Sequence, residues 1–93
     1  MRTWLVDNAS GDGTPELVAG EFPDVDVVAL PTNVGFSAAN NLAIRRGAAE
    51  YVLVLNPDTV VTEGALDRLL RLMDAHPQIA IAGPRLVRDD GTL

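Results

Sequence analysis

The feature that most constrains the fold of this chain is an apolar run, Tyr51 to Leu55, that ends abruptly at the polar turn Asn56, Pro57 and Asp58. A run of strand-forming residues of this length is typical of a buried strand in a parallel sheet. In open α/β sheets, ligands bind where such strands end. The carboxylate of Asp58 is therefore the first candidate for a functional side chain.

Similar runs occur elsewhere, and helical patterns separate them. Strands are predicted at residues 3–6, 25–30, 51–55 and 79–82. Helices are predicted at residues 14–21, 36–48 and 66–73. Strands that alternate with helices of this length indicate right-handed βαβ units. The predicted fold class is thus α/β, with a mostly parallel, Rossmann-like sheet and flanking helices.

Local signals mark the ends of two of these helices. Thr14 offers a hydroxyl as an N-cap, and Pro15 suits the first helical position. Pro77 ends the third helix, and His76 before it is interpreted as a surface residue near the helix C-terminus, not a catalytic one. An i, i+3, i+4, i+7 apolar stripe defines that helix: Leu66, Leu69, Leu70 and Met73.

Composition excludes several classes of protein. The net charge of −6, with 13 acidic residues against 7 arginines and no lysine, disfavours a nucleic-acid-binding protein. An anionic substrate would need backbone amides, helix ends or a bound cation to offset that charge. The absence of cysteine excludes disulfides and thiolate metal sites. No stretch approaches the roughly 20 apolar residues of a membrane span, and a cytoplasmic protein is expected.

Polar loops follow three of the predicted strands, at residues 7–10, 33–36 and 56–59. Parallel strands deliver these loops to one edge of the sheet, so their side chains are expected to converge. Asp58 beside the Asn56 amide suits a divalent cation with oxygen ligands, although the same residues could merely turn the chain. Asp7 could accept hydrogen bonds from a ribose or a base, or could begin an Asx-turn.

The loop before the second helix also has two interpretations. Asn33 and Gly35 could turn backbone amides toward an anion, or could form a helix cap with a turn. Asn40 or Asn41 on that helix could point toward the same edge. The segment from Gly11 to Gly13 does not match a dinucleotide fingerprint, because Glu16 replaces its third glycine.

In order along the chain, residues 6–14 (VDNASGDGT), 33–41 (NVGFSAANN) and 55–59 (LNPDT) resemble the donor half of family 2 glycosyltransferases. Residues 83–86 and 90–93 resemble the bacterial rhamnosyltransferase-like branch. The resemblance implies a GT-A fold that binds a nucleotide-diphosphate sugar. It also implies inverting transfer of the sugar to a glycan or lipid-linked acceptor in envelope or surface polysaccharide synthesis, in the cytoplasm at the inner face of the membrane.

The resemblance also assigns roles to residues. Asp58 would hold Mg²⁺ or Mn²⁺ on the diphosphate, while Asn56 stands where the fuller motif has an aspartate. No residue here matches the usual catalytic base, which is expected outside this chain. The nucleotide-sugar-binding set implied is Asp7, Asn8, Ser10, Asn33, Gly35, Asn40, Asn56 and Asp58.

Residues 1–93 are thus interpreted as a single, partial donor-binding domain that lacks the family's first strand and acceptor half. That strand would lie between the strands at residues 3–6 and 51–55, and its loss predicts a homo-oligomer sealed by strand pairing. A non-catalytic nucleotide-sugar-binding module or a degenerate remnant is the alternative. A phosphoacceptor signalling domain is disfavoured, because the chain has no lysine to meet the phosphoryl group.

Overall fold

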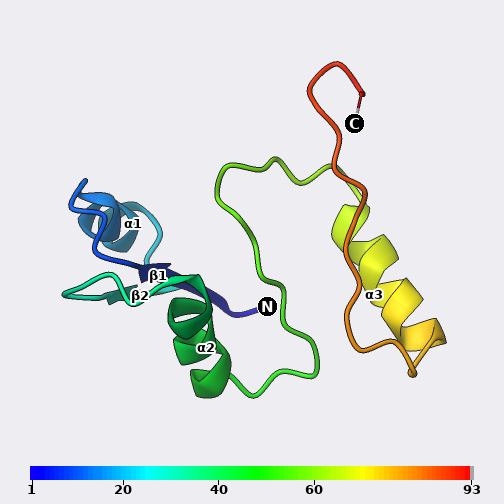
Figure 1. Ribbon diagram of the computed structural model, residues 1–93, viewed down its shortest axis with the longest axis horizontal. Helices are drawn as coiled ribbons and strands as arrows, with labels where there is room; N and C mark the ends of the chain where they lie inside the picture. The colour runs from blue at the N-terminus through cyan, green and yellow to red at the C-terminus, as the bar shows by residue number, and fades with distance from the viewer. Residues whose placement is uncertain (93) are drawn as a thin grey trace. The chain divides into compact units, whose positions relative to one another are not determined.

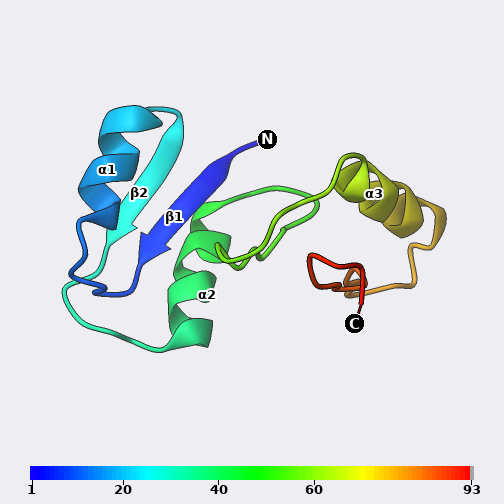
Figure 2. The same ribbon diagram turned by 90° about the horizontal axis from the view of Figure 1, so that it is seen from above.

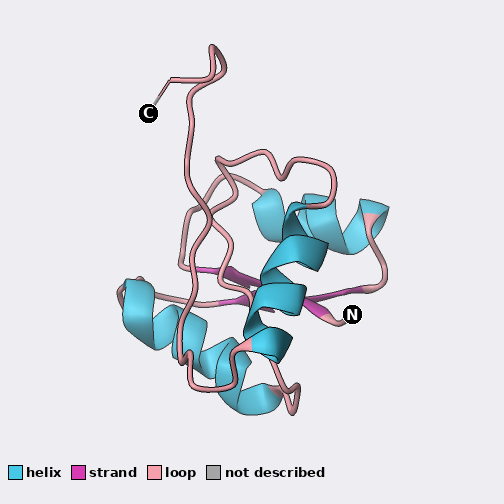
Figure 3. Cartoon of the chain, turned by 90° about the vertical axis from the view of Figure 1, so that its right-hand side faces the viewer, coloured by secondary structure: helices cyan, strands magenta, loops and turns pink. Residues whose placement is uncertain are grey.

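The computed structural model describes residues 1–92, and the chain divides into two compact units, residues 1–54 and 55–93. Each unit is described by itself. Figures 1 and 2 label the elements, and Figure 3 colours the chain by secondary structure. The elements are β1 (Thr3–Asp7), α1 (Thr14–Glu21), β2 (Val25–Ala29) and α2 (Phe36–Arg46) in the first unit, and α3 (Ala65–Ala75) in the second.

The first unit is a βαβ unit followed by a second helix. β1 and β2 pair in parallel, with Thr3 opposite Val25 and Asp7 opposite Ala29. One more bond extends the pairing, because the Leu30 N–H donates to the Asp7 carbonyl at 2.9 Å. α1 contacts both strands, α2 contacts β1, and the two helices lie on opposite sides of the strand pair (Figures 1 and 2). The predicted α/β class is therefore confirmed.

Two of the four predicted strands are absent from the described residues. The segments 51–55 and 79–82 carry no ladder of hydrogen bonds, so the sheet within residues 1–92 has two strands. An extended segment becomes a strand only when a neighbour supplies its backbone partners, and apolar sequence does not specify that neighbour. The side chains of residues 52–55 are instead 49–56 % exposed.

The three helices lie where the periodicity predicts them, but the predicted cap of α1 is wrong. Gly13, in the left-handed conformation with φ 79°, is the N-cap, and no side chain bonds to the helix from that position. The Thr14 hydroxyl and N–H both donate to Asp12 Oδ1, at 2.6 and 3.0 Å. The Asp12 carboxylate, one residue before Gly13, thus accepts from the first free N–H of the helix.

Helix α2 ends two residues before its predicted end. The Gly47 N–H donates to the carbonyl oxygens of Ala43 and Ile44, which closes the last turn. Arg45 and Arg46 lie in that turn, where cations favour the helix dipole. In α3, three members of the apolar stripe are half-buried, and Leu70 is 44 % exposed.

The core of the first unit is small. Among the described residues, Ala39 of α2 and Pro15 of α1 are buried, whereas the strand side chains are mostly half-buried. Ala39, the buried residue of α2, is small, and α2 contacts β1. Within residues 1–92, the helices are all too short or too polar to cross a lipid bilayer.

Asp26 is the polar exception in the apolar β2 strand. It pairs in register with Trp4, and its Oδ2 accepts a hydrogen bond from Arg2 Nε at 2.8 Å. The same guanidinium lies 4.6 Å from the centre of the Trp4 ring. The hydrogen bond and charge of Arg2 lower the pKa of Asp26, so a carboxylate is accommodated at this end of the sheet.

Candidate functional site

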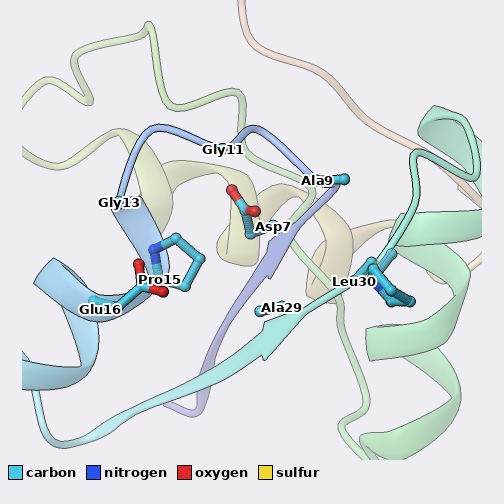
Figure 4. A pocket seen from close by; sticks show the side chains of 9 residues that line it. Asp7, Ala9, Gly11, Gly13, Pro15, Glu16, Ala29 and Leu30 are labelled. Carbon is cyan, nitrogen blue, oxygen red and sulfur yellow. The ribbon is translucent and has the colours of Figure 1, made fainter.

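An open pocket of about 640 Å³ lies at the carboxyl ends of β1 and β2, within the first unit (Figure 4). Two loops border it, the β1 loop (residues 8–13) and the β2 loop (residues 30–35). In Figure 4 the carboxylate of Asp7 projects from the end of β1 toward the β1 loop. The lining residues are Asp7, Ala9, Gly11, Gly13, Pro15, Glu16, Ala29, Leu30 and Pro31.

Ser10 holds the Asp7 carboxylate in one orientation. Asp7 Oδ1 accepts a hydrogen bond from Ser10 Oγ at 2.5 Å, and Oδ2 accepts one from the Ser10 N–H at 3.2 Å. Asp7 thus begins a turn, but its carboxylate accepts from the N–H three residues on, whereas an Asx-turn uses the N–H two residues on. The turn uses only part of the acceptor capacity of a carboxylate, which has about four lone-pair sites. Asp7 can therefore both begin the turn and bind a donor in the pocket.

Asp12 organises the rest of the β1 loop, a role that the sequence analysis missed. Hydrogen bonds from the Thr14 side chain, then from the Ser10 side chain and the Thr14 N–H, lower the pKa of Asp12 to about 2. Ser10 Oγ lies 2.7 Å from Asp12 Oδ1 as well as 2.5 Å from Asp7 Oδ1, and its single proton can be donated to only one of these carboxylates at a time. The sequence could have predicted this role of Asp12, because an aspartate two residues before a threonine at a helix start favours an Asx-type turn.

The β2 loop is held by two asparagine side chains. The Val34 N–H donates to Asn8 Oδ1 at 2.8 Å, and Asn8 Nδ2 donates to the Gly35 carbonyl at 3.1 Å. The Gly35 N–H donates to Asn33 Oδ1 at 2.9 Å. The cap-with-turn interpretation of this loop therefore describes the structure, and the amides of Val34 and Gly35 are engaged within the protein.

Asn40 is turned toward its own helix. Its Nδ2 donates to the Phe36 carbonyl at 2.9 Å, one turn earlier in α2, and the residue is half-buried. Its neighbour Asn41 is exposed.

The structure gathers five members of the predicted binding set around the two loops, namely Asp7, Asn8, Ser10, Asn33 and Gly35.

The second unit carries the other two predicted site residues. Asn56 Oδ1 accepts a hydrogen bond from the Asp58 N–H at 3.1 Å, and the Asn56 carbonyl accepts from the Thr59 hydroxyl at 2.7 Å. This turn leaves the Asp58 residue exposed. Within residues 1–92, no three acidic, histidine or cysteine side chains gather into a metal-binding group.

Comparison with known proteins decides the family. The sequence matches the family model described as Glycosyl transferase family 2 over residues 1–93. The chain belongs to glycosyl transferase family 2. The resemblance carried by its three ordered motifs is thereby confirmed.

Bacterial proteins named as glycosyltransferases are among its relatives. The chain is 34% identical to the N-acetylglucosaminyl-diphospho-decaprenol L-rhamnosyltransferase of Mycobacterium tuberculosis, over 96% of this chain and 33% of that protein. It is 35% identical to an N-acetylglucosaminyltransferase of Mesorhizobium japonicum, over 80% of this chain and 19% of that protein. The chain thus spans a third or less of the length of these relatives. No solved structure matches it.

Proposed function

We propose that this chain is the donor-binding domain, residues 1–93, of a family 2 glycosyltransferase. It binds a nucleotide-diphosphate sugar for inverting transfer to an acceptor hydroxyl in the synthesis of an envelope or surface polysaccharide. The observation that carries the proposal is the oriented Asp7 carboxylate in an open pocket at the ends of two parallel strands. Ligands of α/β sheets bind at this edge.

The pocket suits the nucleoside part of the donor. Its apolar wall, formed by Pro15, Ala29, Leu30 and Pro31, offers surface against which a base can pack. Asp7 supplies acceptors for ribose hydroxyls or a base imide. A volume of about 640 Å³ lies within the range of small-molecule sites.

The diphosphate requires a cation, because the chain has a net charge of −6 and acidic residues line the pocket. We assign Mg²⁺ or Mn²⁺ to Asp58, whose exposed carboxylate is a hard oxygen ligand of the kind these ions prefer. Asn56 holds the Asp58 backbone in its turn and adds a polar group beside it. Such a cation would stabilise negative charge on the departing nucleoside diphosphate.

The proposed acceptor and setting are supported by the name of one relative. The mycobacterial protein is named for a decaprenol-linked acceptor, which supports a lipid-linked or glycan acceptor here and a place at the inner face of the membrane. The general base for the acceptor hydroxyl is expected in the part of the relatives that this chain does not span. The exposed apolar residues 52–55 support assembly into a homo-oligomer through strand pairing.

Titration calorimetry with uridine and thymidine diphosphates, and with their sugar derivatives, tests the proposal. We expect Asp7→Asn to weaken binding about ten- to a hundredfold with or without Mn²⁺, since a hydrogen bond to a charged group contributes roughly 1.5–3 kcal/mol. Asp58→Asn should remove only the strengthening that Mn²⁺ causes. Asn41→Ala, an exposed position on α2, is the matched control. Equal affinities for wild type and Asp7→Asn, or no binding to any probe, would refute the proposal.

A further inference from the structure

The two loops that border the pocket are joined by one side chain. Ala9, Gly11 and Gly13 of the β1 loop line one side of the pocket, and Leu30 and Pro31 of the β2 loop line the other. The backbone link between Leu30 and Asp7 is the last one of the strand pair, and the chains then diverge. Beyond that point, the Asn8 side chain connects the two loops.

The Asn8 amide bonds to the β2 loop at both of its ends. Its oxygen accepts from the Val34 N–H at 2.8 Å, and its nitrogen donates to the Gly35 carbonyl at 3.1 Å. These partners fix which end of the amide is oxygen and which is nitrogen, because an N–H needs an acceptor and a carbonyl needs a donor. The side chain therefore acts as one more rung between the loops, across 26 and 27 residues of sequence.

The loop that Asn8 holds has an unusual conformation. Gly35 has φ 88° and ψ 166°, a region that only glycine adopts readily. Its carbonyl accepts from Asn8 and from the Ala39 N–H at 3.2 Å, and its own N–H donates to Asn33. A conformation of this kind persists only where surrounding bonds hold it. The Asn8 side chain is thus part of what keeps the start of α2 in place.

We propose that Asn8 is a positioning residue that sets the width of the pocket, and that it does not itself contact the nucleotide. Both ends of its amide bond to the β2 loop, so the side chain holds that loop against the β1 loop that carries Ser10. This inference rests on the proposed function. It changes the role that the family resemblance assigns to Asn8, from ligand contact to support of the pocket.

Amide hydrogen exchange followed by NMR tests the link in the free chain. We expect the Val34 N–H to exchange at least about tenfold faster in Asn8→Ala, because its acceptor is lost. Asn8→Asp retains an acceptor for Val34 but loses the donor to Gly35, and it should give an intermediate rate. Asn41→Ala, an exposed position on α2, should leave the rate unchanged. An unchanged rate in Asn8→Ala would overturn the link.

A double-variant cycle separates positioning from contact, with uridine diphosphate and thymidine diphosphate as probes. We expect Asn8→Ala to weaken binding about tenfold. Because Asn33 supports the same loop, Asn8→Ala and Asn33→Ala together should weaken binding by clearly less than the product of their separate factors. Factors that simply multiply, or an unchanged affinity in Asn8→Ala, would overturn the positioning role.

The two proposals fail in different ways. If the wild-type chain binds no nucleotide probe, the proposed function is refuted, and with it the role of Asn8 at that site, whatever the exchange rate of Val34. If the wild type binds a probe and Asn8→Ala binds it equally well, the proposed function stands and the positioning role is refuted. Thermal unfolding of each variant confirms that the compared chains are folded.

Discussion

Replacing Gly35 by alanine isolates a backbone effect in the candidate site. Nothing lies within 4 Å of a Cβ added at this position, so the substitution creates no steric clash. The φ of 88° and ψ of 166° nevertheless belong to a region that costs a non-glycine residue about 1–3 kcal/mol. We therefore expect Gly35→Ala to lower the free energy of unfolding of the first unit by about 1–3 kcal/mol.

Gly20→Ala in α1 is the matched control for that measurement. It also has open space around the added Cβ, but its φ is not in the left-handed region. Alanine there should raise the free energy of unfolding by up to about 1 kcal/mol, because glycine disfavours a helix. Urea unfolding followed by the fluorescence of Trp4, the sole tryptophan, reports on the first unit. If Gly35→Ala were as stable as Gly20→Ala, the argument from backbone conformation would be refuted.

Three further predictions concern the first unit and its surface. The pKa of Asp12 is lowered to about 2, so the carboxylate should stabilise the fold fully above about pH 4 and lose this effect toward pH 2. In urea unfolding, the difference in stability between wild type and Asp12→Asn should therefore shrink as the pH falls from about 4 to about 2. Ala9 has φ 61°, and Ala9→Gly should raise the free energy of unfolding by about 0.5 kcal/mol, whereas a decrease would contradict this account. Val54 is 50 % exposed in the apolar segment proposed to pair between copies of the chain. Light scattering should show oligomers of wild type at micromolar concentration and monomers of Val54→Asp, and a monomeric wild type would exclude assembly.

Much of the local structure follows from the sequence. The two paired strands and all three helices lie within a few residues of their predicted bounds. Apolar spacing, glycine and proline act over a few neighbouring residues, which is why sequence suffices for them. The cap of α1 is the exception, because Gly13 takes the N-cap position in the left-handed conformation and the Thr14 hydroxyl donates to Asp12 instead of capping the helix.

The candidate site was predictable in part. The sequence places Asp7 at the end of a strand, and it gives the order of the motifs that identify the family. It does not show that Asn8 bonds to Val34, because this contact depends on how loops 26 residues apart are brought together. Whether Asp58 joins this site through a cation stays a prediction.

The sequence by itself determined the helices, the parallel βαβ unit and the family, because each depends on local periodicity or on ordered motifs. Only the tertiary structure decided which apolar runs become strands and which loop amides are already engaged. The physical reason is that a strand and a loop hydrogen bond each require a partner from a distant part of the chain. Residues 51–55 have a strand's sequence but no ladder partner among the described residues, and Asn8 obtains its partners from the other side of the pocket.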